Sequence, residues 1–325
     1  MNKKQLIESL NFFINNDQLG ITVYCLLKKD ESFMPKALDI KDNDVASLTQ
    51  LFTTSISQNL LHKEELSVLP LSSSDERKNV IYEYDLEIPE ELKSLDTILS
   101  TDNIPKFSFQ TDDFLDIKAL LIEIGNNENQ IVLYKTMAPI NIFGRKSFFL
   151  KQVLSNERFE KINEDFIRIS SGFQLLKVNN SLFVIDLETI EKFFGFHDII
   201  KKEATQSLDV IEQIKLLENP ETLKELIEDV TFARKLTKVA KNSPVIKTGI
   251  PNKDIIGFTL THPAVKGKLR YNQTKDKIQL DTKVSKNLFV KLLNDDFLTS
   301  ELTKLYYDSL AKDGVSEEQS TNDIN

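Results

Sequence analysis

Cysteine, glycine, histidine and tryptophan are all scarce in this chain of 325 residues. The chain contains one cysteine, nine glycines, three histidines and no tryptophan. A single cysteine excludes an intramolecular disulfide framework and is typical of a reducing compartment. Cys25 lies in residues 20–27, an apolar run typical of a buried strand, which favours a core thiol over a reactive nucleophile.

The shortage of glycine and histidine removes several classes of catalytic site. Neither a G-x-G-x-x-G motif nor a Walker-type G-K-[ST] motif occurs. His62, His197 and His262 are far apart, and no cysteine or histidine stands at metal-ligand spacing from any of them. The sequence therefore predicts no catalytic residue, no cofactor and no metal site.

Long apolar runs are also missing, and no stretch approaches the roughly 20 residues that span a bilayer. The first segment is amphipathic and carries Glu8, unlike the continuously apolar core of a secretory leader. We therefore expect a cytoplasmic protein that is not an integral membrane protein.

Charge is present in quantity but is unevenly distributed. The net charge is −9. Residues 1–134 hold 12 Lys and Arg against 23 Asp and Glu, whereas residues 231–291 hold 14 against 3. An acidic part and a separate basic surface are thus predicted, and a polyanion would bind the basic one. Solvated lysines at helix ends and turns are the alternative explanation.

Hydrophobic periodicity predicts a mixed fold. Helices are expected over residues 2–15 and from Asp42 to Ile56, and strands over 20–28 and 78–86. Because residues 63–115 are acidic and broken by Pro70, Pro89 and Pro105, the first domain is predicted to end near residue 110.

The later parts of the chain are predicted to form hairpins first and then helices. Two hairpins are predicted, around residues 125–129 and around Asn179-Asn180, and a shorter one over 269–280. Helices are expected over 197–218, from Asn219 to about residue 241, and from Ser285. The predicted class is α+β, with an acidic α/β domain over 1–110, a sheet-centred domain with a helical C-terminal part over 111–312, and a disordered tail over 313–325.

One enzymatic alternative stays open, a Mg²⁺-dependent nuclease with a (D/E)-x-K element at a strand end. Asp281-Thr282-Lys283 follows a predicted strand and has Asp276 nearby. The same short pattern also occurs at residues 39–41, 91–93 and 116–118, so each match is a weak signal.

Two segments are candidates for phosphate binding. The first interleaves cations with aromatic residues, and its cations are Lys135, Arg145, Lys146, Lys151, Arg158, Lys161 and Arg168. We interpret its aromatic residues as core, whereas Arg145 and Lys146 follow Gly144 in a predicted turn. The second segment places Gly249 and Gly267 beside cations, namely Lys247, Lys253, Lys266, Lys268 and Arg270. Such cations would neutralise phosphates without reading bases.

Several stretches of the chain carry a family resemblance, namely Lys118–Ile124, Tyr134-Lys135, Pro139–Asn141, Arg145–Phe149, Arg158–Ile162 and Leu293–Thr303. Over about residues 110–310 the chain resembles the KwaB family of the Kiwa anti-phage defence system. The resemblance implies a cytoplasmic subunit that binds phage DNA without cutting it, works at the inner face of the membrane with the membrane-embedded protein KwaA, and associates into dimers or larger oligomers.

The predicted DNA-binding set therefore has two origins. Lys135, Arg145, Lys146, Arg158 and Lys161 lie inside the stretches that carry the resemblance. The other members, which are supported by charge alone, are Lys247, Lys266, Lys268 and Arg270. Two alternatives from other classes remain, the nuclease and a protein adaptor whose basic patch contacts phospholipid headgroups.

Overall fold

Two structural units make up the chain. The computed structural model describes residues 1, 3–16, 19–63, 66–74, 79–126, 129–137, 142–143, 150–153, 158–161, 166–299 and 306–308, with the backbone alone at 142–143, 150–153, 158–161 and 306–308. Unit 1 comprises Met1–Leu71 and Glu76–Phe194, and unit 2 comprises Ser72–Asp75 and Gly195–Asn325. Each unit is described separately below.

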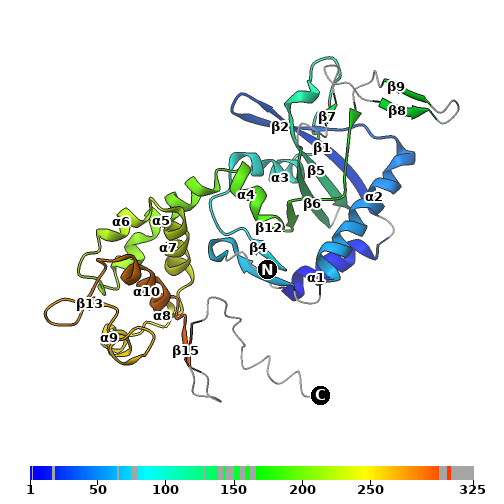
Figure 1. Ribbon diagram of the computed structural model, residues 1–325. Helices are drawn as coiled ribbons and strands as arrows, with labels where there is room; N and C mark the ends of the chain where they lie inside the picture. Colours follow the sequence, from blue (N-terminus) through cyan, green and yellow to red (C-terminus); the bar gives the residue numbers. More distant parts are fainter. Residues whose placement is uncertain are drawn as a thin grey trace, which may run out of the picture. The chain divides into compact units, whose positions relative to one another are not determined.

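A mixed sheet forms the centre of unit 1 (Figure 1). Its strands lie in the order β2-β1-β5-β6-β11-β12-β4-β3. All neighbours are antiparallel except β3 and β4, which are parallel. The bounds are β1 Gly20–Lys29, β2 Ser32–Ala37, β3 Ser67–Pro70, β4 Val80–Glu83, β5 Ile117–Gly125, β6 Gln130–Thr136, β11 Leu175–Val178 and β12 Ser181–Val184.

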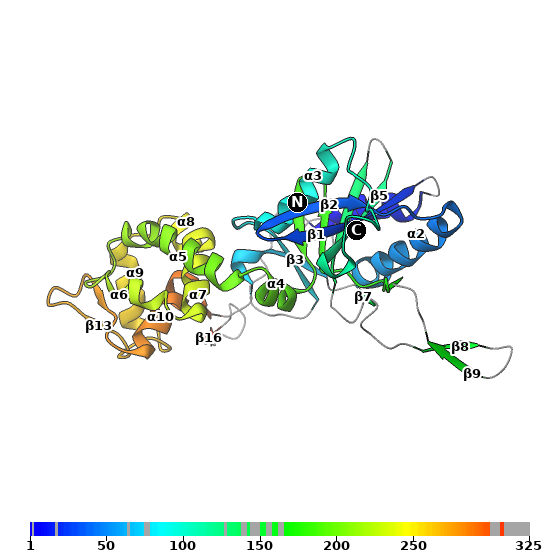
Figure 2. The same ribbon diagram turned by 90° about the horizontal axis from the view of Figure 1, so that it is seen from above.

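The domain boundary predicted near residue 110 is wrong. Strand β1 pairs with β5 along almost its whole length, from Gly20 opposite Gly125 to Leu27 opposite Ile117. Figure 2 shows β2, β1 and β5 side by side. A boundary at residue 110 would separate hydrogen-bonded neighbours, and the division between the units falls instead between Phe194 and Gly195. The α+β class is confirmed, and the predicted tail over 313–325 lies outside the described residues.

Helices cover both faces of this sheet. On one face, α1 (Lys3–Ile14) and α2 (Asp42–Ile56) contribute Leu6 and Phe52 to a core that also contains Leu133 of β6. On the other face, Tyr134 contacts Phe194, which follows α4 (Leu187–Phe193), and donates a hydrogen bond to Glu91 of α3 (Glu90–Ser100). Successive residues of a strand point to opposite faces, so β6 contributes to both layers.

Cys25 is a core thiol, as the sequence predicts. It is fully buried in β1, and its Sγ lies 3.5 Å from the carbonyl oxygen of Lys36. Burial raises the pKa of the Cys25 thiol to about 12. A thiol in this environment stays protonated near neutral pH and is a poor nucleophile.

Short hairpins and turns complete unit 1. The predicted hairpins β5–β6 and β11–β12 are confirmed, and Asn179 adopts the left-handed conformation, φ 52°, that a tight turn requires. The remaining elements are η1 Ser57–Leu61, η3 Phe114–Asp116, β7 Ile142–Phe143 paired with β10 Phe166–Ile167, and β8 Leu150–Val153 paired with β9 Arg158–Lys161. The short helix η2 Leu71–Ser73 has its first residue in unit 1 and its last two in unit 2.

Unit 2 is mainly helical in its described residues and has a core of its own. Phe196, Leu236, Phe289 and Leu293 are each at most 1% exposed and come from three helices. The bounds are α5 Phe196–Glu212, α6 Thr222–Leu226, α7 Val230–Asn242, α8 Pro244–Lys247, α9 Asn252–Thr261, α10 Lys283–Leu293, β13 Arg270–Tyr271 paired with β14 Ile278–Gln279, and β15 Phe297–Thr299 paired with β16 Tyr306–Asp308.

The single helix predicted from Asn219 to about residue 241 is wrong, because the structure has two helices there. Asp229 is extended, φ −82° and ψ 112°, and its carboxylate accepts hydrogen bonds from the amides of Thr231 and Phe232. An aspartate in this role starts a helix rather than continuing one. Helix α7 therefore begins at Val230. This start determines which of its residues face the core and which basic residues face outward.

The burial of Glu91, which accepts a hydrogen bond from Tyr134, makes unit 1 sensitive to pH. Burial raises the pKa of Glu91, although Tyr134, Lys28 and Lys118 partly oppose the shift. A carboxyl whose folded pKa is raised stabilises the fold below its ordinary pKa and loses that contribution as the pH rises through the folded value. Glu91→Gln should therefore gain stability relative to the unmodified protein as the pH rises above the ordinary carboxyl range. Urea unfolding at a series of pH values measures this difference, and a difference independent of pH would contradict it.

Candidate nucleic-acid interface

Lys135 is the first of the predicted DNA contacts along the chain, and its buried position argues against a role in DNA binding. Its side chain is only 4% exposed. The ammonium donates hydrogen bonds to Ser170 Oγ at 2.8 Å and to the carbonyl of Gly172 at 2.7 Å. Burial and the positive charge of Arg168 lower the pKa of Lys135. Because the ammonium is enclosed and bonded within unit 1, we correct the prediction and remove Lys135 from the candidate interface.

The other predicted contacts in this part of the chain are less completely described. Arg145 and Lys146 lie outside the described residues. Arg158 and Lys161 are the first and last residues of β9, which pairs with β8, and the structure describes the backbone alone at these positions. Their assignment to DNA binding stays a prediction from sequence.

The four predicted cations of unit 2 are all exposed. Lys247 ends α8, and Lys266 and Lys268 flank Gly267, whose φ of +76° turns the chain between α9 and β13. Lys268 Nζ donates a hydrogen bond to the carbonyl of Ala264 at 2.9 Å, which fixes its position without neutralising its charge. These side chains can reach phosphates from the solvent.

Arg270 is the member of this group that carries a counter-ion. Its Nη1 lies 2.8 Å from Asp281 Oδ2, and 74% of its side chain is exposed. An exposed ion pair contributes only about 0–1 kcal/mol, so a phosphate can replace the carboxylate at little cost. Arg270 therefore remains a candidate contact.

The geometry around Asp281 is that of a structural turn. The next residue, Thr282, is the N-cap of α10 and forms a capping box with Ser285, and Lys283 is the first residue of the helix. Asp276 accepts hydrogen bonds from Asn272 and Thr274 within its own turn, which lower its pKa. Among the described residues, no group of three or more His, Cys, Asp or Glu side chains could hold a metal ion. These contacts lend no support to the nuclease alternative.

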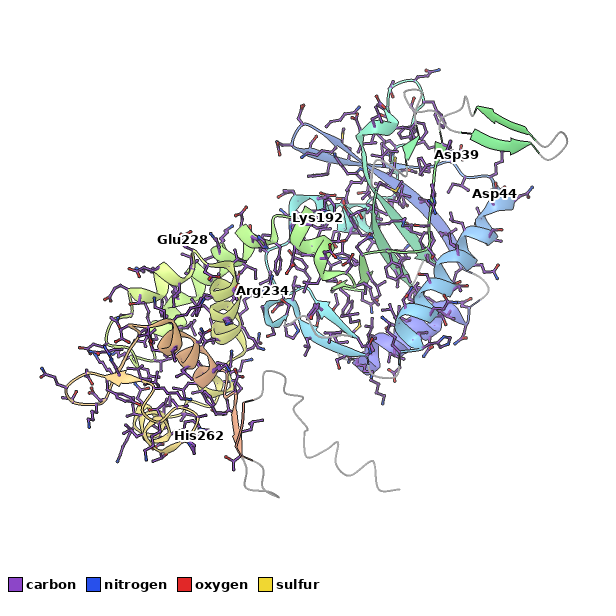
Figure 3. All side chains as sticks on the ribbon, in the orientation of Figure 1. Asp39, Asp44, Lys192, Glu228, Arg234 and His262 are labelled. Carbon is purple, nitrogen blue, oxygen red and sulfur yellow. The ribbon has the colours of Figure 1, made fainter. Side chains whose placement is uncertain are left out.

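A second group of cations lines a pocket between α7 and α10, which are neighbours in Figures 1 and 2. We call it the α7–α10 pocket, and its volume is about 230 Å³. Its charged side chains are Arg234, Lys235, Lys238, Lys291 and Asp296. Among the described residues that line the pocket, four are cations and one is a carboxylate, and Arg234 is labelled in Figure 3.

Packing holds the cations of α7 in place. The Arg234 guanidinium lies 5.4 Å from the centre of the Phe196 ring, and the Lys235 ammonium lies 5.2 Å from that of Phe232. Lys235 Nζ also donates a hydrogen bond to Asn287 Oδ1 at 3.0 Å. These contacts orient the positive charge along one side of the helix, whose other side buries Leu236.

Charges of both signs act on Lys235 in the pocket. Burial lowers the pKa of Lys235, and the nearby charges of Lys291 and Lys283 lower it further, against the opposite effects of Asp229 and Asp296. Burial, which disfavours the charged form, is thus the main cause of the lowered pKa of Lys235.

Sequence reasoning missed this pocket, although part of its signal was visible. Arg234, Lys235 and Lys238 stand three and four residues apart, so they share one side of a helix. In the single helix predicted from Asn219 to about residue 241 they would stand near the C-terminus, where cations complement the helix dipole. Only the tertiary contact with α10 adds Lys291 and encloses the space.

Comparison with known proteins identifies the family. The family model described as "Kiwa protein KwaB-like" matches residues 114–303, close to the 110–310 over which the sequence resemblance was predicted. "Kiwa protein KwaB" of Escherichia coli O55:H7 is 28% identical over 320 residues, which cover 98% of this chain and all of that protein. No solved structure matches. The matched region includes strands β5 to β12 of unit 1 and nearly all the described part of unit 2, and the chain belongs to the KwaB-like family of Kiwa proteins.

Proposed function

We propose that this protein acts in Kiwa anti-phage defence by binding DNA through its phosphate backbone, without cleaving it. The observation that carries the proposal is the concentration of positive charge in unit 2 of an otherwise acidic chain. Residues 231–291 hold 14 Lys and Arg against 3 Asp and Glu, whereas the whole chain has a net charge of −9. Such an asymmetry directs a polyanion to one unit.

The exposed cations of unit 2 supply the contacts. Lys247, Lys266, Lys268 and Arg270 all reach solvent, and each can bind a phosphate oxygen. Lysine contacts to phosphates position a duplex but carry no sequence information. Binding of this kind is sequence-independent, which suits a protein that must recognise DNA from different phages.

We further propose that the protein works with the membrane-embedded protein KwaA, which recruits it to the inner face of the membrane, and that it associates with itself as a dimer or larger oligomer. The support is family membership. In the part of the chain that the structure describes, no helix is long and apolar enough to cross a membrane. Attachment to the membrane through KwaA would require KwaA to be present, so co-expression followed by membrane fractionation, with and without KwaA, tests this part of the proposal.

Purified protein and linear duplex DNA test the function directly. The protein is incubated with the DNA in Mg²⁺ and in a chelator, and each sample is analysed both for a mobility shift and for the length of the DNA. We expect a shift in both conditions and DNA of unchanged length. Shortened DNA in Mg²⁺ alone would establish the nuclease alternative, and unshifted DNA in both conditions would remove DNA binding.

Asp281→Ala tests whether this carboxylate takes part in DNA binding. Because Asp281 pairs with Arg270, its removal frees a cation on the candidate interface. DNA affinity should stay the same or rise by up to about fivefold, which corresponds to one exposed ion pair. Fluorescence anisotropy of labelled duplex measures the change. Weaker DNA binding by a normally folded Asp281→Ala protein would show that the carboxylate takes part in the site.

A further inference from the structure

The hairpin formed by β13 and β14 carries a concentration of positive charge in unit 2. Residues 266–277, which lead into the hairpin and form its loop, contain five Lys and Arg residues and one acidic residue. The cations are Lys266, Lys268, Arg270, Lys275 and Lys277. The first four are exposed, and Lys277 is half-buried. This part of unit 2 is therefore suited to contact a polyanion.

The loop of this hairpin projects into the solvent. In both views it extends away from the helices of unit 2 (Figures 1 and 2). Four consecutive residues at its tip, Gln273–Asp276, are all exposed. At the other end of the hairpin, Ile278 is fully buried and Leu280 is only 2% exposed. The hairpin is thus anchored at its base and open at its tip.

Hydrogen bonds fix the base of the hairpin to the rest of unit 2. The hydroxyl of Tyr271 donates to Thr259 Oγ1 of α9 at 2.9 Å. The backbone amide of Ile278 donates to the carbonyl of Leu216 at 2.9 Å, and its carbonyl accepts from the amide of Glu218 at 3.0 Å. These bonds on both strands hold the direction in which the loop points.

The loop itself is ordered by its own side chains. The amide nitrogen of the Asn272 side chain donates to Thr274 Oγ1 at 2.9 Å and to Asp276 Oδ1 at 2.6 Å. Asn272 Oδ1 accepts from the backbone amides of Asp276 and Lys277 at 3.0 and 3.1 Å. A loop that is already ordered loses little conformational entropy when a partner binds.

The acidic groups near the hairpin do not cancel its charge. Arg270 lies 2.8 Å from Asp281, Lys277 lies 3.9 Å from Glu218, and these four side chains are between 33% and 74% exposed. Together with Asp276, three carboxylates thus face the five cations of residues 266–277. Exposed ion pairs are weak, so phosphates can take the place of the paired carboxylates.

A two-stranded hairpin has the dimensions to enter the major groove of B-form DNA. Neighbouring strands lie about 4.7–4.9 Å apart. The major groove is about 12 Å wide and admits a two-stranded β-ribbon, whereas the minor groove is only about 6 Å wide. The major groove of an A-form RNA duplex is deep and narrow, and side chains do not reach into it. A hairpin that enters the major groove therefore distinguishes a DNA duplex from an RNA duplex.

We propose that the β13–β14 hairpin enters the major groove of duplex DNA and makes the protein bind B-form DNA in preference to double-stranded RNA. The inference rests on the proposed function, because it names the form of nucleic acid that unit 2 recognises. Lys275 and Lys277 carry charge into the groove, between its two phosphate strands. Lys266 and Lys268 contact phosphates at the edge of the groove, so most contacts are independent of sequence.

Fluorescence anisotropy with a DNA duplex and an RNA duplex of the same sequence tests the inference. The full-length protein should bind the DNA about tenfold or more tightly than the RNA, because the RNA lacks the contacts of Lys275 and Lys277. Equal or tighter binding of the RNA would overturn the role of the hairpin. Absence of binding to the DNA duplex would instead remove the proposed function on which the inference rests.

Shortening the hairpin should remove the preference for DNA. Replacement of Asn272–Lys277 by the two residues Asn-Gly joins Tyr271 to Ile278, which are paired, through a common hairpin turn. The affinity for DNA should fall by about tenfold or more, whereas that for RNA should stay within about twofold. A preference for DNA that persists in the folded, shortened protein would contradict the proposal.

Lys253→Gln is the matched control for charge. The shortened loop loses two lysines and one aspartate, and Lys253→Gln changes the net charge by the same amount at an exposed position of α9. It should lower the affinities for DNA and RNA by similar factors and leave the preference intact. A preference that disappears in this control would show that net charge, and not the hairpin, determines it.

Lys275→Asn serves if the shortened protein does not fold. Residue 275 has φ +56°, a left-handed conformation that asparagine tolerates, so the substitution removes one charge without straining the loop. The affinity for DNA should fall by about three- to fivefold and that for RNA should be unchanged. A loss shared equally by both duplexes, or no loss for DNA, would overturn the proposal.

Discussion

Charge reversal at Lys247, Lys266 and Lys268 is expected to reduce the affinity for duplex DNA by about 100-fold or more. All three side chains are exposed on unit 2. Removing three phosphate contacts worth up to about 1 kcal/mol each gives roughly this factor, and the introduced glutamates add repulsion. The slope of the logarithm of the affinity against the logarithm of the salt concentration should also become shallower by about one for each lost contact. Anisotropy titrations at several salt concentrations measure both quantities.

A matched set of substitutions controls for total charge. Lys4, Lys41 and Lys63 are exposed lysines of unit 1, and their conversion to glutamate changes the net charge of the chain by the same amount. We expect this control protein to bind DNA within a few-fold of the unmodified protein. If both triple variants lose affinity equally, net charge rather than the surface of unit 2 determines binding.

Phe289→Ala is expected to destabilise unit 2 by about 3–5 kcal/mol, the usual cost of truncating a buried phenylalanine. Phe289 is 1% exposed and lies in α10, the helix that also carries Asn287 and Lys291 of the pocket. The substitution leaves a cavity that packed neighbours cannot fill completely. The midpoint of the transition assigned to unit 2 should fall by about 10 °C or more in differential scanning calorimetry.

Phe183→Ala is the corresponding change in unit 1. Phe183 is fully buried in β12 and belongs to the core of the sheet. Because each unit has a hydrophobic core of its own, each substitution should lower the midpoint of a different calorimetric transition. A loss of less than about 1 kcal/mol from Phe289→Ala would contradict the close packing described for α10.

The sequence predicted the elements of the fold better than their arrangement. The turn at Asn179-Asn180 was predictable because the two strands that it joins are adjacent in sequence and the turn chemistry is local. The pairing of β1 with β5 joins residues about 100 positions apart, such as Gly20 and Gly125, so local signals do not encode it. The wrong boundary near residue 110 follows from that difference.

The same distinction applies to the candidate site. Exposure of Lys266 and Lys268 could be anticipated, because they flank a glycine in a turn. Burial of Lys135 could not, because its partners Ser170 and Gly172 approach only after β6 and β11 pair. The N-cap at Asp229 was present in the sequence but was outweighed by the apolar periodicity on either side of it.

Salt dependence of DNA binding is the most direct measurement of the central claim. The affinity of the purified protein for a duplex of arbitrary sequence is measured between about 50 and 200 mM salt. If the four exposed candidate cations of unit 2 neutralise phosphates, the affinity should fall about a hundredfold over this range, because each contact releases condensed counterions. The slope of the logarithm of the affinity against the logarithm of the salt concentration should be the same for a duplex of unrelated sequence. Affinity that stays constant across the range would contradict the claim that unit 2 binds DNA through its phosphates.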